Sequence, residues 1–321
     1  MERLPIDINR NSKLLVLREN EVRSLTAFFN SFESTLTKRE YTAASREFLS
    51  LVSKHIGELS ELSRDHVISY QAWLRSKGRS RNTINKKISA ISSLCKHLAF
   101  EGICDKDLTY GVKRPPATNK RETADFTNDE IKRIFATLNP RLKFYTSHRA
   151  ILAVGFYTGL RSREIRTLKI KNIGEVAGHR VLNLVIKGGK PLEVPLTPFA
   201  YNALAEHLRF LAEKYKIDTE DKEQWVFPSL GPTFKNEPIT ASGLRAILNT
   251  KLKQAGIPIS SIRRYSPHSM RASIAGHLLN DQEVPLEQVQ KLLGHSSPAT
   301  TQRYNKRITA HDKSPVYKIE Y

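Results

Sequence analysis

Apolar and polar residues alternate with the period of an α-helix along the first third of the chain. Apolar positions recur three or four residues apart over residues 19–108, which predicts a series of amphipathic helices. A short amphipathic helix is expected over residues 64–74, and Ser80 is a favourable N-cap for the last helix of the series. The apolar stripes of the other three helices are Val22, Leu25, Phe28 and Phe29; Tyr41, Ala44, Phe48, Leu51 and Val52; and Ile84, Ile88, Ile91, Leu94 and Leu98. Residues 1–17 lack this period and are interpreted as an extended arm.

The rest of the chain mixes helical periods with one clear hairpin. Thr127 and Glu130 have the spacing of a capping box, and a later apolar helix closes at Gly159. Residues 181–186 and 192–196 read as two strands joined by the turn Lys187-Gly188-Gly189-Lys190, which displays two lysines. Residues 215–239 are expected to form a charged loop between helices.

A boundary between two domains is expected near residues 115–124. Pro115 and Pro116 stand in a polar stretch that cannot continue a helix. A length of 321 residues also favours about two domains. We therefore expect an arm (1–17), a helical domain (18–114), a linker (115–124), a second domain (125–304) and a tail (305–321).

Charge indicates a polyanionic partner. The net charge is +20, and residues 1–117 carry 20 basic against 13 acidic side chains, so both parts of the chain are basic. The alternative is a basic surface without a partner. The two cysteines have no metal-ligand spacing and are expected to be free thiols. No run of about 18 apolar residues and no apolar signal-peptide core is present, so neither a membrane span nor a secretory leader is expected.

One predicted helix has basic residues and no acidic ones on its polar face. Residues 66–100 contain no acidic residue, and the candidate DNA contacts there are Arg79, Arg81, Lys86 and Lys87. Such a helix suits the phosphate backbone of duplex DNA, whereas a merely solvated face usually mixes both signs of charge.

Two predicted helix starts combine an arginine with free backbone N–H groups. Arg161 follows Gly159 at the start of one helix, and Pro267 follows the N-cap Ser266 at the start of another. His268 and Arg271 are three residues apart and share a face of that first turn. Both helix starts are candidate anion sites; a capped surface helix is the alternative reading of the second.

A third candidate lies near the end of the chain. A helix is expected to stop at Gly294, His295 follows, and Tyr304 comes nine residues later on what is predicted to be a further helix. Taken alone, this tyrosine reads as a surface or packing residue.

Together these segments resemble the tyrosine recombinases of the phage integrase family. The resemblance is carried by Thr158-Gly159-Leu160-Arg161 with Glu164, the hairpin Lys187, His268-x-x-Arg271, Leu293-Gly294-His295, and Thr300-Thr301-x-x-Tyr304. It extends to the first domain, where residues 82–87 resemble the family's core-binding helix. Arg163 departs from the family pattern, which usually has serine at this position, and Lys306 stands where a histidine is common.

The resemblance implies a mechanism and a role for each of these residues. Tyr304 would attack a DNA phosphodiester and form a 3′-phosphotyrosyl link, so that neither ATP nor another cofactor is needed. Arg161, Arg271 and His295 would bind the phosphate, and His268 would accept the tyrosine proton. Lys187 would protonate the leaving 5′-oxygen, with Lys190 as the alternative. No metal ligand is expected.

The resemblance also implies an architecture and a partner. It predicts a mainly α protein with a small antiparallel sheet, in which a helical core-binding domain and an α+β catalytic domain clamp double-stranded DNA. The protein would act as a homotetramer on two duplexes through a Holliday junction, in the cytoplasm of a bacterium or on behalf of a phage or mobile element. The tail would dock on a neighbouring protomer or pack locally.

Other functions remain open at this point. The chain could bind DNA without strand exchange, or be a related phosphotyrosyl enzyme such as a topoisomerase IB or a telomere resolvase. The target sequence, the biological role and the choice between attack within one protomer and on a neighbour's phosphate are also open.

Overall fold

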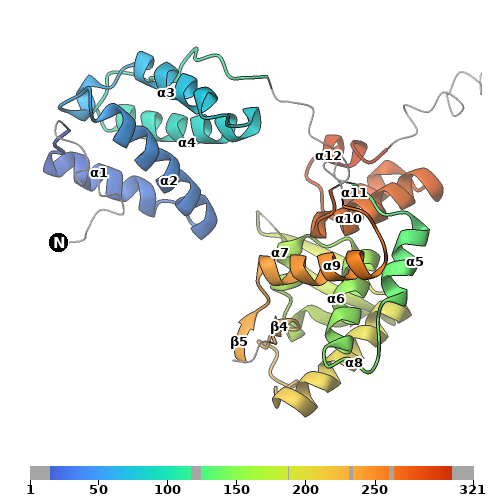
Figure 1. Cartoon of the computed structure of the whole chain (residues 1–321). Coiled ribbons are helices and arrows are strands. Elements are labelled where there is room, and N and C mark those ends of the chain that lie inside the picture. Colours follow the sequence, from blue (N-terminus) through green and yellow to red (C-terminus); the bar gives the residue numbers. More distant parts are fainter. Residues whose placement is uncertain (1–14, 117–123, 187, 231–233, 260–263, 306–321) are drawn as a thin grey trace, which may run out of the picture. The chain divides into compact units, whose positions relative to one another are not determined.

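The computed structural model describes residues 15–116, 124–186, 188–230, 234–259 and 264–305. It divides into two compact units, residues 1–121 and 122–321, and each unit is described by itself (Figure 1). Most of the predicted arm (1–14), residues 117–123 of the predicted linker, and all but the first residue of the predicted tail lie outside the described residues.

The first unit is helical. It comprises α1 (Glu19–Asn30), α2 (Thr35–Val52), a 3₁₀ turn (Leu59–Glu61), α3 (Arg64–Ser76) and α4 (Arg81–Phe100). The predicted stripe of α4 is buried, and Ser80 caps this helix by accepting a hydrogen bond from Thr83 N–H at 3.2 Å. Leu15, which the periodicity assigned to the arm, is buried in the same core.

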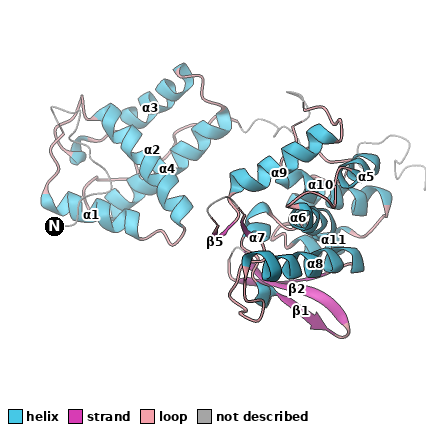
Figure 2. Ribbon diagram, turned by 60° about the horizontal axis from the view of Figure 1, so that its bottom comes forward, coloured by secondary structure: helices cyan, strands magenta, loops and turns pink. Residues whose placement is uncertain are grey.

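The second unit combines helices with two small antiparallel sheets (Figure 2). Its helices are α5 (Asn128–Ala136), α6 (Tyr145–Thr158), α7 (Ser162–Arg166), α8 (Pro198–Tyr215), α9 (Ala241–Gln254), α10 (Pro267–Gly276), α11 (Leu286–Leu293) and α12 (Pro298–Gln302). A 3₁₀ turn (Ile170–Asn172) follows α7, and a π-helical turn (His277–Asp281) follows α10. Apolar α6 packs against both α8 and α10 and contributes to the core of the unit.

The larger sheet has the order β1 (Ile173–Val176), β2 (His179–Ile186), β3 (Lys190–Pro195). The β2–β3 hairpin was predicted, and its register pairs Ile186 with Lys190. Leu182, Leu184 and Ile186 alternate with exposed residues, so one face of β2 enters the core. β1 was not anticipated.

The prediction of a loop over residues 215–239 is partly wrong. It contains β4 (Pro228–Ser229) and β5 (Lys235–Pro238), which form the second, two-stranded sheet. Buried Val226 and Phe227 lead directly into β4 and anchor this segment to the core. No helix in the described part of the chain is long and apolar enough to cross a bilayer.

Candidate active site

The site is built on the C-terminal ends of two helices. α6 ends at Gly159 (φ 65°) and α11 ends at Gly294 (φ 60°), both in the left-handed conformation that favours glycine. A Cβ at Gly159 would lie 2.7 Å from Leu293 and 2.8 Å from Ile274, so the two helix ends approach closely only because this residue has no side chain. The last carbonyls of a helix lack intrahelical partners and carry partial negative charge, so they attract cations.

Arg271 connects these two helix ends. Its Nη1 donates to Gly159 O at 2.8 Å and its Nη2 donates to Leu293 O, while the side chain is only 1% exposed. Burial, and then the nearby Arg161, lower the pKa of Arg271 to about 10, which still leaves it charged at neutral pH. Its Nε has no hydrogen-bond partner among the described residues. The arginine therefore presents a fixed positive charge with unused donors.

Arg161 lies beside it at the N-cap of α7. Its Nη1 donates to Glu164 Oε1 at 2.8 Å, its backbone N–H donates to Glu164 Oε2 at 2.6 Å, and its Nη2 approaches Gly294 O at 3.4 Å. Glu164, named above only as part of a motif, thus fixes the guanidinium through an ion pair and the backbone of Arg161 through a second hydrogen bond. The expectation that the backbone N–H at this helix start is free for an anion is wrong for Arg161, because Glu164 accepts that hydrogen.

His295 follows the end of α11 and is buried. Its Nδ1 lies 2.8 Å from Thr301 Oγ1, and its ring stacks against Tyr304 with centroids 6.3 Å apart. Burial, and then the charges of Arg271 and Arg161, lower the pKa of His295 to about 4, so the imidazole is neutral at pH 7. If the threonine hydroxyl donates to Nδ1, the single ring proton resides on Nε2. The place of Thr301 in the Thr-Thr-x-x-Tyr motif predicted neither its contact with His295 nor its burial.

Tyr304 faces His268 of the same chain. The phenol oxygen lies 3.1 Å from His268 Nε2, and His268 stands in the first turn of α10 as predicted. The predicted helix stops short of Tyr304, because α12 ends at Gln302; Tyr304 lies in a following turn, in which its N–H donates to Thr301 O at 3.0 Å and Asn305 N–H donates to Gln302 O at 3.0 Å. Burial raises the pKa of Tyr304, and Arg271, Arg161 and Arg303 oppose that rise.

The structure describes only one of the two hairpin lysines. Lys187 lies outside the described residues, and Lys190 is exposed at the start of β3. A Cβ at Gly294 would lie 2.7 Å from Ile186 and 3.3 Å from Leu192. The base of the hairpin therefore packs beside the end of α11, next to His295.

In the first unit, the predicted basic face is only partly available to a ligand. Arg79, Arg81 and Lys86 are exposed. Lys87 is half-buried and its Nζ lies 2.7 Å from Glu47 Oε1, an oxygen that also accepts from Tyr70 OH. α4 itself carries no acidic side chain, but Glu47 of α2 neutralises Lys87.

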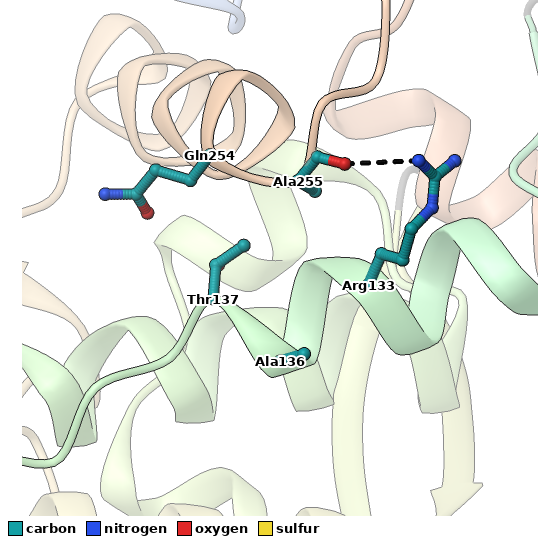
Figure 3. A pocket seen from close by; sticks show the side chains of 5 residues that line it. All are labelled: Arg133, Ala136, Thr137, Gln254 and Ala255. Carbon is teal, nitrogen blue, oxygen red and sulfur yellow. Dashed lines mark hydrogen bonds between the residues drawn. The ribbon is translucent and has the colours of Figure 1, made fainter.

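The cavities found elsewhere in the second unit contain none of the predicted site residues. One open cavity of about 360 Å³ is lined by Arg133, Ala136, Thr137, Gln254 and Ala255 (Figure 3). Arg133 Nη1 donates to Ala255 O across it at 3.2 Å. No group of three His, Cys, Asp or Glu side chains suited to a metal ion occurs in the described part of the chain. Four of the predicted residues, Arg161, His268, Arg271 and His295, thus lie around Tyr304 and not beside this cavity.

Comparisons with known proteins show the family of the chain. Residues 124–311 match the model of the phage integrase family, and residues 29–102 match that of a phage integrase N-terminal SAM-like domain. A tyrosine recombinase XerC from Bacillus pumilus is 31% identical over 273 residues, covering 84% of this chain and 86% of the relative. A tyrosine recombinase XerD from Halalkalibacterium halodurans is 27% identical, covering 80% and 81%.

Solved structures share the fold. The recombinase XerH in a post-cleavage complex with a palindromic difH substrate matches with a TM-score of 0.70 and 20% identity, over 94% of this chain and 84% of that one. A lambda integrase dimer bound to a core site matches with a TM-score of 0.64 and 15% identity, over 88% and 94%. Because the family model covers more than half of the chain and the XerC relative spans most of it, the protein belongs to the phage integrase family of tyrosine recombinases.

Proposed function

We propose that this site-specific recombinase cleaves DNA with Tyr304 as its nucleophile. The phenol oxygen attacks a backbone phosphorus, a 3′-phosphotyrosyl bond forms, and the 5′-oxygen leaves with a proton as a free hydroxyl. The observation that supports this most is the 3.1 Å approach of Tyr304 OH to His268 Nε2 within a cluster that also holds Arg161, Arg271 and His295. The bond energy stays in the phosphotyrosyl link, so rejoining needs no ATP.

His268 is the proposed general base. The raised pKa of Tyr304 keeps the phenol protonated at neutral pH, so an acceptor is needed as the oxygen attacks. His268 Nε2 lies within hydrogen-bond distance of the phenol oxygen, and His268 is exposed in the first turn of α10.

The two arginines and His295 are the proposed phosphate ligands. The pentacoordinate transition state carries extra negative charge on its equatorial oxygens, and pre-oriented guanidinium groups stabilise that charge without reorganising. Arg271 is held by two carbonyls and Arg161 by Glu164, so neither has to be ordered when DNA binds. Neutral His295 adds an Nε2–H donor when the Thr301 hydroxyl donates to Nδ1. With this fixed positive charge we propose that cleavage needs no metal.

The general acid is proposed to be Lys187, with Lys190 as the second candidate. Both belong to the β2–β3 turn, whose base packs beside Gly294. A substrate whose leaving 5′-oxygen is replaced by sulfur separates the two, because a thiolate leaves without protonation. If Lys187 is the acid, this substrate should restore cleavage by Lys187→Ala and should not change cleavage by Lys190→Ala. If Lys190 is the acid, the two results should be exchanged. Failure to rescue either variant would remove the hairpin from this role.

Double-stranded DNA is the proposed partner, bound by a homotetramer on two duplexes in the cytoplasm. The net charge of +20 and the exposed Arg79, Arg81 and Lys86 support DNA binding. XerH and lambda integrase were solved in complexes with their DNA sites. We assign Lys87 to the attachment of α4 to α2 through Glu47, not to DNA.

Attack within one protomer is proposed, because Tyr304 and His268 of the same chain lie together. Mixing Tyr304→Phe with Arg271→Ala tests this. Attack within the protomer predicts no cleavage by the mixture, whereas cleavage restored by mixing would show that the tyrosine acts on a neighbour's phosphate.

Reaction on a plasmid carrying two copies of a DNA site selected by the protein tests the function itself. Recombinants should form in the presence of EDTA. Relaxation of plasmids without the site would favour a topoisomerase, and tight binding without recombinants would favour a DNA-binding protein.

A further inference from the structure

The turn that follows α10 is wound as a π-helix. Residues His277–Asp281 form it, and Gln282 N–H donates to His277 O at 3.0 Å, which is the i to i+5 bond of a π-turn. His277 Nδ1 and Asp281 Oδ2, 2.9 Å apart, span the same turn. π-turns are rare, appear mostly as single turns in α-helices, and are frequent at functional sites.

This π-turn contacts the segment that carries Tyr304. Asn280 is half-buried, and its Nδ2 donates to Tyr304 O at 2.9 Å. The π-turn also packs against α11, and α11 packs against α12, so α10, α11 and α12 form one group (Figure 1). One amide thus connects α10, which carries His268 and Arg271, to the backbone of Tyr304.

The segment around Tyr304 has little support from its own secondary structure. α12 has only five residues, and Tyr304 lies two residues beyond it. The ring lies at the edge of a small apolar cluster formed by Ala275, Leu279, Val289 and Leu293. A five-residue helix is not stable by itself, so contacts from outside must fix the position of the phenol.

We propose that Asn280 is a positioning residue that holds the Tyr304 segment over the phosphate site before cleavage. The inference rests on the proposed role of Tyr304 as nucleophile. Because the hydrogen bond goes to the backbone carbonyl, it orders the segment without touching the phenol and leaves the tyrosine oxygen free to attack. Ordering the nucleophile in advance removes an entropic part of the barrier.

A kinetic asymmetry follows from this role. Before cleavage, loss of the hydrogen bond lets the segment move, so fewer molecules have the phenol in line with the phosphorus. After cleavage, the phosphotyrosyl bond itself holds the tyrosine in place. Asn280→Ala should therefore slow cleavage and leave religation nearly unchanged. A distorted phosphate site would slow both reactions.

The experiment uses the full-length chain and a nicked DNA substrate whose cleaved fragment diffuses away, so that the covalent complex accumulates. We expect Asn280→Ala to slow single-turnover cleavage roughly tenfold. Religation, started by adding a strand with a 5′-hydroxyl to the isolated covalent complex, should change less than about twofold. The affinity for DNA and the thermal unfolding midpoint serve as checks on folding.

Two further variants sharpen the test. Asn280→Asp keeps the size of the side chain but replaces the donor by an acceptor facing a carbonyl oxygen, so it should be at least as slow as Asn280→Ala. Gln282→Ala changes an exposed amide two residues away and should cleave like the wild type. Equal slowing of cleavage and religation, or wild-type cleavage by Asn280→Asp, would overturn the inference. If the wild type itself forms no covalent complex, the proposed function fails; if it does and Asn280→Ala matches it, only the inference fails.

Discussion

At the scale of single residues, burial affects the protonation of arginine and histidine differently in this site. Arg271 stays charged although it is buried, because two helix-end carbonyls accept its hydrogens and its ordinary pKa is far above neutrality. His295 in the same surroundings loses its proton, since its ordinary pKa is near neutrality. The same environment thus produces a fixed cation and a neutral imidazole.

The lowered pKa of histidine leads to a prediction about stability and pH. The pKa values of His295 and of the fully buried His207 are both lowered from 6.5 to about 4, in each case chiefly by burial. Between these values the unfolded chain binds more protons than the folded chain, so the free energy of unfolding should fall as pH decreases from about 6.5 to 4. Urea unfolding across this range measures it.

Matched variants assign the effect to each residue. His207→Gln and His295→Gln should each flatten the pH dependence, because glutamine does not titrate. His66→Gln, at a part-buried histidine that bonds to Ser63 N–H through Nδ1, serves as the control. A His295 imidazole that titrates near pH 6.5 by NMR in the absence of DNA would contradict the proposed neutral state.

The residues of the site were predictable to different degrees. Arg161, His268, Arg271, His295 and Tyr304 stand in short local motifs, and the structure brings all five together. Their roles remain proposals. The partners that hold them were not predictable: Gly159 O and Leu293 O come from helices far apart in the sequence, and only the packed fold brings these carbonyls to one guanidinium.

At the scale of elements, the geometry of the site depends on where helices end. Gly159 and Gly294 were both predicted as helix ends from sequence, because a left-handed residue there is usually glycine. Three strands were missed for physical reasons. β1 has no alternation of buried and exposed residues, and β4, which pairs with the equally unpredicted β5, is only two residues long.

Gly159→Ala tests this dependence on helix ends. The new Cβ would require both a left-handed backbone and room beside Leu293 and Ile274, so we expect a loss of roughly 1–3 kcal/mol in unfolding free energy beyond the backbone cost alone. Gly178→Ala is the matched control, since its φ is 78° and its Cβ would meet nothing within 4 Å. Denaturant unfolding of the two variants gives the difference. Equal losses of unfolding free energy in the two variants would mean that the close packing around Gly159 does not contribute to stability.

At the scale of the whole molecule, charge is the property that the sequence revealed before any motif. A net charge of +20 favours a polyanion, but it does not say which basic residues face the ligand. The structure separates exposed Arg79, Arg81 and Lys86 from Lys87, which is paired with Glu47. Sequence could not make this distinction, because Glu47 and Lys87 are brought together by the packing of α2 on α4.

Salt dependence of DNA binding tests that separation. The affinity for DNA falls as salt rises. Replacing Arg79, Arg81 or Lys86 by alanine should make the negative slope of log affinity against log salt less steep, by about 0.9 for each phosphate that is no longer neutralised. Lys87→Ala should leave the slope unchanged and instead lower the stability of the first unit, because Glu47 keeps a half-buried charge without its partner. An unchanged slope in all three exposed variants would place the DNA surface elsewhere.

Covalent attachment of Tyr304 to DNA is the step on which the other proposals depend, and a nicked substrate carrying the selected site is its sharpest test. We expect a protein–DNA adduct that forms in EDTA, carries the 3′-phosphate on Tyr304 by mass spectrometry of the digested complex, and is absent from Tyr304→Phe. An adduct that persists in Tyr304→Phe, or that maps to another residue, would show that Tyr304 is not the nucleophile.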